Sequence, residues 1–311
     1  MGRNFCNRPE KDPGRIETKK IEEYCCIMLN LLQAVHSTSS SAKPLPDVWA
    51  GLRQHGMRFR QSQLCLIAGQ PNSGKSLMAL VYALKTGVPT LYFSADTDPI
   101  TQMFRTVAGL TGLPQQQVET YLDADSHYFD PLLNERGSHI KWVFDPSPDI
   151  DAIELEILAY GEVYGMAPAL IVIDNLMNCV SVTGEEWSGI RAIMSELHHV
   201  ARKTGACVLA LTHMSEAGTG DPKMPAPRRA ILGKASQLPS MILSIAMNPE
   251  YQEFRVAAVK NRFGEHSADA SNFVTLGIDA SRVQIVDRDV QGMADLRPGV
   301  NFVGLQAISG Q

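Results

Sequence analysis

The stretch "GQPNSGKS" at residues 69–76 has the residue types and spacing of a phosphate-binding loop, G-x-x-x-x-G-K-[ST]. It follows a short apolar run at 64–68 and precedes an amphipathic segment at 76–87. Glycines let the main chain curl so that successive N–H groups face an anion, and the following helix adds the positive end of its dipole. In this context the motif predicts a nucleoside triphosphate site. The expected contact residues are Gly69, Gln70, Pro71, Asn72, Ser73, Gly74, Lys75, Ser76 and Leu77.

The chemistry of such a loop needs a cation and a metal ligand. Lys75 is expected to neutralise the β- and γ-phosphates, and Ser76 to offer its hydroxyl to Mg²⁺. Asp174 closes the apolar run "LIVID", as a Walker-B carboxylate does, and is expected to be the second Mg²⁺ anchor. A turn or helix-cap role is the alternative for this acid. The expected cofactors are therefore ATP and Mg²⁺.

Hydrolysis also needs a group that orients or deprotonates the attacking water. Two acids, Asp96 and Asp98, follow the apolar run 90–94. Asp98 stands directly before Pro99, a position typical of a helix N-cap. We therefore assign the base to Asp96, with Asp98 as the alternative.

The elements that must position these residues alternate between buried strands and helices. Such alternation predicts an α/β fold with a mostly parallel sheet covered by helices on both faces, with ligands at the carboxyl ends of the strands. Four shorter segments after residue 237 are expected to extend the sheet in antiparallel fashion. The expected strands are 64–68, 90–94, 139–144, 169–174, 207–213, 241–247, 253–261, 272–278 and 282–287, and the expected helices are 76–87, 99–110, 149–165 and 190–205.

Composition restricts the class of protein and of partner. The 311 residues are 44% hydrophobic and 20% charged, as in a soluble globular protein, with a net charge of −5. An acidic chain can contact DNA only through a local basic patch or a collar formed by several subunits. The six cysteines have no metal-site or disulfide spacing, which favours reduced thiols in the cytoplasm.

The N-terminal part contains an amphipathic helix rather than a membrane span. The apolar stretch 24–35 is too short to cross a bilayer, and the polar residues before it do not fit a signal peptide, so no membrane partner is expected. The helix, residues 15–36, packs either on its own domain or on a neighbouring subunit. We expect a helical segment and linker at 1–46, an ATPase domain at 47–287 and a tail at 288–311.

These motifs in this order resemble the RecA superfamily, in particular the core of DnaB-like hexameric helicases. The resemblance covers about residues 50–287 and is carried by the P-loop, the acid after the second strand, "LIVIDN", "LALTHMSE" and "KNRFG". It implies a RecA-like fold and a homo-oligomer, a hexameric ring, that hydrolyses ATP and pulls single-stranded DNA through its centre. "ADTDP" and the chain length are also similar to small RepA-type helicases. The family's acid is usually Glu, whereas Asp96 is one methylene shorter.

The resemblance also assigns roles to residues far from the P-loop. His213, after "LALT", corresponds to the sensor of the γ-phosphate, with a purely structural histidine as the alternative. Lys260 and Arg262, in "KNRFG", correspond to cations that reach the nucleotide of a neighbouring subunit, where an arginine finger stabilises developing charge. An exposed basic strand end is the alternative for this pair.

In RecA-like motors the loops after the Walker-B and sensor strands face the centre of the ring, and here these loops are 178–189 and 214–234. Trp187 in the first loop is expected either to stack on a base or to lie in the core. The second loop is either a solvated surface loop or a site for backbone phosphates. Its candidate nucleic-acid residues are Lys223, Arg228, Arg229 and Lys234.

The leading hypothesis is thus an ATP-driven translocase or helicase. Two alternatives stay open: a RecA-like recombination or strand-annealing ATPase that does not unwind DNA, and a KaiC-like regulatory ATPase that binds only protein partners. Stimulation of hydrolysis by DNA and unwinding of forked DNA separate the three.

Overall fold

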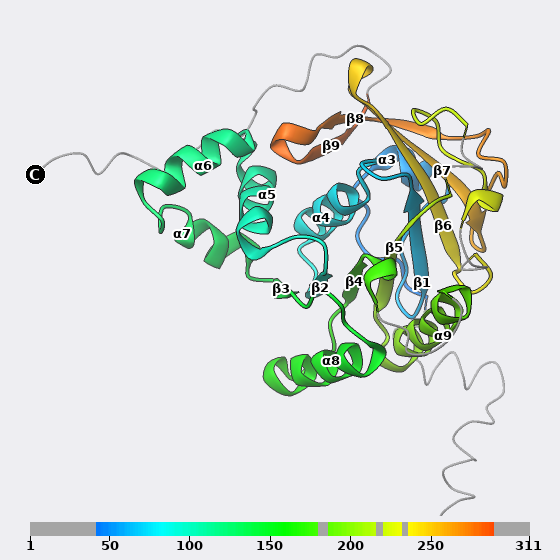
Figure 1. The fold of residues 1–311 in the computed structure, drawn as a ribbon, viewed down its shortest axis with the longest axis horizontal. Coiled ribbons are helices and arrows are strands. Elements are labelled where there is room, and N and C mark those ends of the chain that lie inside the picture. Colours follow the sequence, from blue (N-terminus) through cyan, green and yellow to red (C-terminus); the bar gives the residue numbers. More distant parts are fainter. Residues whose placement is uncertain (1–41, 180–185, 216–219, 232–235, 289–311) are drawn as a thin grey trace, which may run out of the picture. The chain divides into compact units, whose positions relative to one another are not determined.

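The structure, a computed structural model, describes residues 42–179, 186–215, 220–231 and 236–288, and within them the strands form one nine-stranded sheet in the order β3-β2-β4-β5-β1-β6-β7-β8-β9 (Figure 1). The six strands from β3 to β6 are parallel, and β7 to β9 are antiparallel. The predicted α/β class is confirmed. The strands are β1 (Leu64–Gly69), β2 (Thr90–Ser94), β3 (Ile140–Val143), β4 (Leu170–Asp174), β5 (Cys207–His213), β6 (Met241–Asn248), β7 (Glu253–Asn261), β8 (Val274–Asp279) and β9 (Gln284–Asp287).

Helices cover both faces of the sheet, and the strand residues alternate between two hydrophobic clusters. In β1, Cys65 and Ile67 belong to the cluster that includes residues of α4, whereas Leu64 and Leu66 belong to the cluster that includes residues of α8 and α9. This double covering explains why most residues of the parallel strands are apolar. The helices are α3 (Ala50–Gln54), α4 (Lys75–Thr86), α5 (Pro99–Thr111), α6 (Gln115–Ala124), α7 (Asp130–Leu132), α8 (Ile150–Tyr164) and α9 (Glu186–Thr204).

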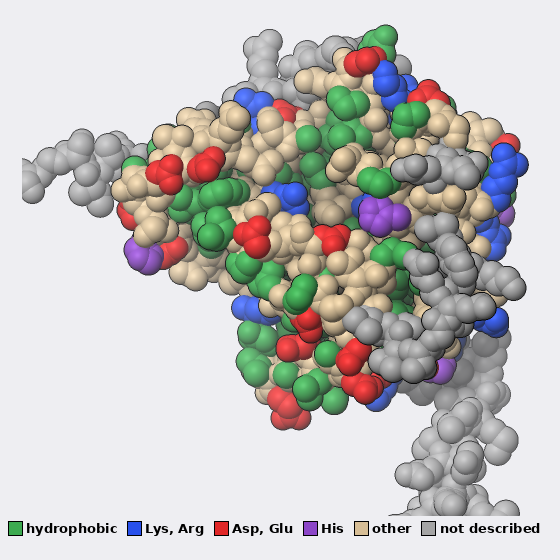
Figure 2. All heavy atoms as spheres, viewed as in Figure 1, with side chains coloured by type: hydrophobic (Ala, Val, Ile, Leu, Met, Phe, Trp, Pro, Cys, Tyr) green, Lys and Arg blue, Asp and Glu red, His purple; other side chains and the backbone are tan. Residues whose placement is uncertain are grey.

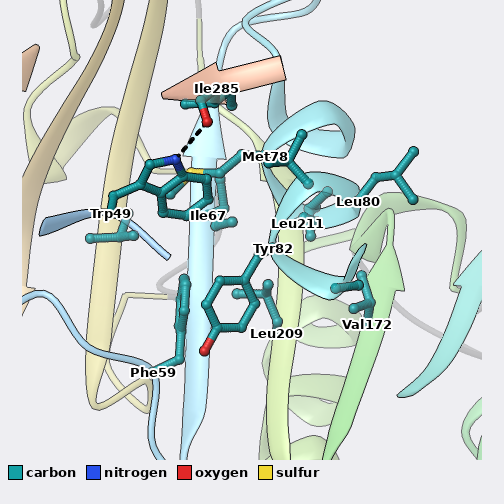
Figure 3. Packing of buried hydrophobic residues seen from close by; sticks show 14 of the residues in the cluster. Trp49, Phe59, Ile67, Met78, Leu80, Tyr82, Val172, Leu209, Leu211 and Ile285 are labelled. Atoms are coloured by element: carbon teal, nitrogen blue, oxygen red, sulfur yellow. Dashed lines mark hydrogen bonds between the residues drawn. The ribbon is translucent and has the colours of Figure 1, made fainter. Parts of the chain in front are cut away.

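The core on the α4 face joins the two ends of the described chain. Trp49, just before α3, donates its indole N–H to the carbonyl of Ile285 in β9 at 3.0 Å (Figure 3). Tyr82 of α4 lies between Trp49 and Phe59, with ring centroids 6.1 and 4.7 Å away. These contacts attach the segment before β1 and the last strand to the helix that follows the P-loop.

The other face carries an exposed apolar stripe on α8. Leu155, Leu158 and Val163 are each more than half exposed, although their helix is buried along Ile153 and Ile157. Figure 2 shows hydrophobic and acidic side chains interspersed on the surface over α8. None of the described helices combines the length and the hydropathy that crossing a bilayer requires.

The direction of β6 differs from the prediction. We expected all four C-terminal strands to be antiparallel, but β6 pairs in parallel with β1, with Cys65 opposite Met241, and only β7 to β9 reverse. The long connection from β5 lets the chain return to the amino ends of the parallel strands before β6 begins, so that β6 runs parallel to β1. The short turn at Pro249–Tyr251 instead makes β6 and β7 an antiparallel hairpin. The mostly buried sequence of β6, in which only Met247 is half-buried, is also typical of a parallel strand.

Most other elements begin and end within a few residues of the prediction, and the helices α3, α6 and α7 were not predicted. Helix α6 has one buried residue, Val118, so its sequence carries little helical periodicity. The cysteines in the described part, Cys65, Cys179 and Cys207, are buried free thiols. Residues 1–41, with most of the predicted N-terminal helix and linker, and the tail 289–311 lie outside the described residues, and the proposed domain boundaries stay predictions.

Candidate nucleotide site

The P-loop connects β1 to α4 with a backbone that side chains would obstruct. Gly74, the N-cap of α4, has a φ of 86°, in the left-handed region that glycine tolerates best. A Cβ on Gly74 would lie 2.8 Å from the ring of Phe254, and a Cβ on Gly69 would collide with the hydroxyl of Ser73. Packing therefore requires glycine at both positions, and at Gly74 the left-handed conformation requires it as well.

The loop opens on a cavity of about 530 Å³ with the character of an anion site. The hydroxyl of Ser73 is buried and has no hydrogen-bond partner, and the first main-chain N–H groups of α4 lie at the same place. A phosphate would satisfy such donors, so the loop fits a nucleoside triphosphate. The cavity is lined by Asn72, Gly74, Lys75, Ser76, Leu77, Leu80, Asp96, Thr97, Arg105, Gln115, Asp174, Asn175, His213, Met247, Ala280 and Val283.

The ammonium group of Lys75 is buried and folded back on the loop. Its Nζ donates to the carbonyls of Gln70 at 2.9 Å and Gly69 at 3.3 Å. Burial lowers the pKa of Lys75 to about 8, while the nearby charges of Asp174 and Asp96 oppose that shift. A triphosphate would supply the negative charge that this site lacks for a fully protonated lysine.

The two predicted Mg²⁺ ligands are in contact with each other. Ser76 donates its hydroxyl hydrogen to Oδ1 of Asp174 at 3.0 Å, and Tyr92 donates to Oδ2 at 2.9 Å. Burial raises the pKa of Asp174, although these two hydrogen bonds lower it. A hydroxyl and a carboxylate at the same point are hard oxygen donors that suit Mg²⁺. Tyr92 was not predicted; its signal is a hydroxyl at the centre of a wholly buried strand.

Asp96 and Asp98 have separate surroundings. Asp98 is the N-cap of α5, accepting from the main-chain N–H groups of Ile100 and Thr101, both at 3.0 Å, so its predicted capping position is confirmed. Asp96 faces the cavity instead and accepts from the side-chain amides of Asn175 and Asn178. Neither asparagine was predicted, although Asn175 directly follows the Walker-B acid.

His213 lies at the end of β5, between the P-loop lysine and the turn after β4. Its Nδ1 is 3.4 Å from Nζ of Lys75, and its Nε2 is 3.5 Å from Nδ2 of Asn175. Burial and the charge of Lys75 lower the pKa of His213, which favours the neutral ring. A neutral imidazole has one acceptor nitrogen, so it can accept from only one of these two donors at a time.

Lys260 and Arg262 are absent from the lining of this cavity. The main-chain N–H of Arg262 donates to the carbonyl of Ser240, and the N–H of Ser240 donates to the carbonyl of Leu64. Arg262 therefore lies level with Leu64, the first residue of β1, whereas the P-loop begins at Gly69, the last residue of that strand. Five residue steps along a strand span about 17 Å, farther than an arginine side chain extends. Arg262 is exposed, and Lys260 donates to the carbonyls of Ser236 and Gln237.

Burial lowers the pKa of Lys260 to about 8, and the nearby charges of Arg262 and Arg228 lower it further. These three residues therefore form one basic cluster. It belongs to the surface on the β7 side of the molecule, remote from the P-loop of the same chain.

The predicted nucleic-acid residues are not gathered in one place. Lys223 forms an ion pair with Glu250, at the turn between β6 and β7, at 2.8 Å. Arg228 donates to the carbonyl of Ser236 at 3.1 Å, the same oxygen that Lys260 uses, and Arg229 is exposed. Lys234, the side chain of Trp187 and parts of both predicted loops lie outside the described residues.

Comparison with known proteins places this arrangement in a family. The profile of the AAA_25 family, an AAA domain, matches residues 36–219. The chain belongs to this family. It is 35% identical to the Gene 65 protein of Mycobacterium phage L5 over 272 residues, covering 82% of this chain and 97% of that protein. It is 33% identical to the Gene 65 protein of Mycobacterium phage D29, covering 73% of this chain and all of that protein.

Solved structures share the fold at low sequence identity. A solved ATPase domain superposes with a TM-score of 0.69 at 14% identity, covering 86% of this chain and 99% of that one. A DnaB-like replicative helicase gives 0.67 at 15%, covering 88% and 71%, and the RadB recombinase gives 0.51 at 18%, covering 79% and 100%. The chain thus carries an AAA domain, and the predicted RecA-like fold, which it shares with a DnaB-like helicase, is confirmed.

Proposed function

We propose that this protein is an ATP-dependent motor of the DnaB-like type, which hydrolyses ATP between subunits of a homo-oligomeric ring and moves along single-stranded DNA. The observation that carries the proposal is the separation of two charged groups within one chain. The phosphate-binding loop Gly69–Ser76 follows the carboxyl end of β1, whereas the cluster of Lys260 and Arg262 lies at the opposite end of the strands. A second copy of the chain would bring them together.

The residues around the P-loop supply the chemistry of hydrolysis. The main-chain N–H groups of the loop and Lys75 hold the phosphates, and Asp96 orients or deprotonates the attacking water. Ser76 and Asp174 would hold Mg²⁺, which neutralises phosphate charge when bound. His213 is placed to respond to the phosphate through Lys75.

The neighbouring subunit contributes the remaining cation. Phosphoryl transfer spreads charge over the equatorial oxygens in its transition state, and a guanidinium brought to them stabilises that charge. Supplied as Arg262 from the next copy, this group makes hydrolysis depend on assembly. The exposure of Arg262 supports this role, because its side chain is free to meet a partner.

Contacts with DNA are proposed for the loop after β5. Arg229 is exposed and Arg228 belongs to the same basic cluster as Lys260 and Arg262, so the loop adds positive charge to the surface that also carries the trans cation. Lys223 is the weaker candidate, because Glu250 already pairs with it. Repetition around a ring would form a basic collar on an acidic chain.

The test is to measure ATP hydrolysis with and without single-stranded DNA, together with the mass of the particle in solution. We expect ring-sized particles whose hydrolysis rate rises with DNA and falls with added salt. Unwinding of forked DNA would distinguish a helicase from a recombination or annealing ATPase. An ATP hydrolysis rate that does not change when single-stranded DNA is added would favour a regulatory ATPase and contradict the proposal.

A further inference from the structure

Both carboxylate oxygens of Asp96 are held by side-chain amides from one short turn. Nδ2 of Asn175 donates to Oδ2 at 2.6 Å, and Nδ2 of Asn178 donates to Oδ1 at 2.6 Å. Asn175 is the N-cap and Asn178 the last residue of the 3-10 turn Leu176–Asn178 that follows β4. Because β2 pairs with β4, with Ser94 opposite Asp174, this turn lies beside the segment that carries Asp96.

The orientation of the Asn175 amide is determined by its own surroundings. Its Oδ1 accepts the main-chain N–H of Met177 at 2.6 Å, so its Nδ2 must point toward Asp96. The side chain is 4% exposed, which leaves little room for another rotamer. One of the two donors to Asp96 is therefore fixed before any nucleotide arrives.

The second donor comes from a more open position. Asn178 is half-buried, does not line the nucleotide cavity and accepts a hydrogen bond from Ser147 on its main-chain carbonyl. Its side-chain amide reaches Asp96 from outside the cavity. It therefore contacts the acid without being placed to contact the substrate.

We infer that Asn175 and Asn178 are positioning residues that fix the carboxylate of Asp96 for the attack of water; this inference rests on the proposed ATP hydrolysis. An aspartate free to rotate about its side-chain bonds would spend only part of its time in the productive orientation, and two donors on opposite oxygens remove that freedom. Each carboxylate oxygen has about two lone-pair sites, so one on each is left to accept from water. The two amides thus orient the carboxylate of Asp96 and leave part of its hydrogen-bonding capacity for the water.

The test uses the full chain with DNA and compares Asn178→Ala with Asn178→Asp. The first variant removes the donor, and the second keeps the shape of the side chain but replaces the amide with a charge that repels Asp96. We expect kcat to fall about 10- to 100-fold in both, since small misplacements of a catalytic group cost up to that much, while the Kd for a non-hydrolysable ATP analogue stays unchanged. Asn134→Ala, an exposed asparagine elsewhere, is expected to match the unmodified chain.

A double-mutant cycle separates positioning from general support of the fold. If Asn178 acts through Asp96, its removal costs nothing further in an Asp96→Ala background, so the two effects are strongly non-additive. An equal loss in both backgrounds, or no loss in Asn178→Ala, would overturn the inference while leaving the ATPase intact. An unmodified chain that binds ATP but does not hydrolyse it would contradict the proposed function and this inference with it.

Discussion

At the residue scale, the central feature is a lysine whose pKa is lowered by burial despite two nearby carboxylates. Lys75 is buried and donates to two carbonyls of its own loop, and its pKa is lowered to about 8. Phosphates favour the charged form and would raise that pKa. Nucleotide binding is therefore linked to the protonation of one side chain.

This linkage predicts how affinity depends on pH. Below about pH 8 Lys75 is already charged and binds without proton uptake; above it, binding must add a proton, so affinity falls as pH rises. One unit above the pKa about a tenth of the free protein is charged, so we expect the Kd for ATP to be about tenfold higher than at neutral pH. Titration calorimetry in buffers of different ionisation enthalpy measures the proton directly.

Lys75→Met is the control for this prediction. The variant should bind ATP weakly and with no change across the same pH range. A slope that persists in Lys75→Met would assign the titration to another group, such as Lys260, whose pKa is also lowered to about 8.

A second residue-scale prediction concerns the hydroxyl that holds the Walker-B acid. Tyr92→Phe keeps the buried ring and removes the donor to Oδ2 of Asp174. We expect a loss of about 1 kcal/mol in the free energy of unfolding and a severalfold rise in the Mg²⁺ concentration needed for half-maximal hydrolysis. Urea denaturation and a Mg²⁺ titration of ATPase activity measure the two effects, and an unchanged Mg²⁺ requirement would contradict a role for Tyr92 at this site.

At the element scale, the sequence was most informative where a strand is buried and a helix is capped. The run "LCLIAG" has no charged residue and "LIVID" has one only at its end, and α4 and α5 end at glycines with positive φ. The direction of β6 was missed although the sequence carried two signals for a parallel strand, its mostly buried run and its long connection from β5, because all four C-terminal segments were predicted together as antiparallel.

In the candidate site, too, some residues could be predicted from the sequence and others could not. The P-loop, Asp96, Asp174 and His213 come together because the strands they follow, β1, β2, β4 and β5, are neighbours in a parallel sheet. Their partners Tyr92, Asn175 and Asn178 depend on strand register and on a turn, neither of which local sequence reveals. The ion pair of Lys223 likewise depends on a turn distant in sequence.

The P-loop as an element predicts a contrast between two glycines of one helix. Gly74 and Gly87 flank α4 and both have positive φ, but a Cβ on Gly74 meets Phe254, whereas one on Gly87 meets no atom within 4 Å. We expect Gly87→Ala to cost about 1 kcal/mol in the free energy of unfolding and Gly74→Ala about 2–4 kcal/mol, with loss of ATP binding. Equal costs measured by urea denaturation would show that the contact with Phe254 does not constrain the loop.

At the scale of the whole molecule, one chain holds only part of the proposed active site. Its phosphate-binding loop and its Lys260–Arg262 cluster lie at opposite ends of the strands, so an assembled active site would contain residues from two copies. Alone, Lys75→Ala should lose ATP binding, and Arg262→Ala should bind ATP but hydrolyse it about 10³-fold more slowly. A ring made of either variant alone stays inactive, because every one of its interfaces lacks the same group.

Mixing these two variants is the most direct test of the central claim. In a randomly mixed ring, about a quarter of the interfaces would join an intact phosphate-binding loop from Arg262→Ala to an intact arginine from Lys75→Ala. We predict that two inactive preparations regain up to about that share of the original ATPase rate when combined with single-stranded DNA. No recovery in rings shown to have mixed, or full activity of Arg262→Ala by itself, would contradict the sharing of one active site between two copies.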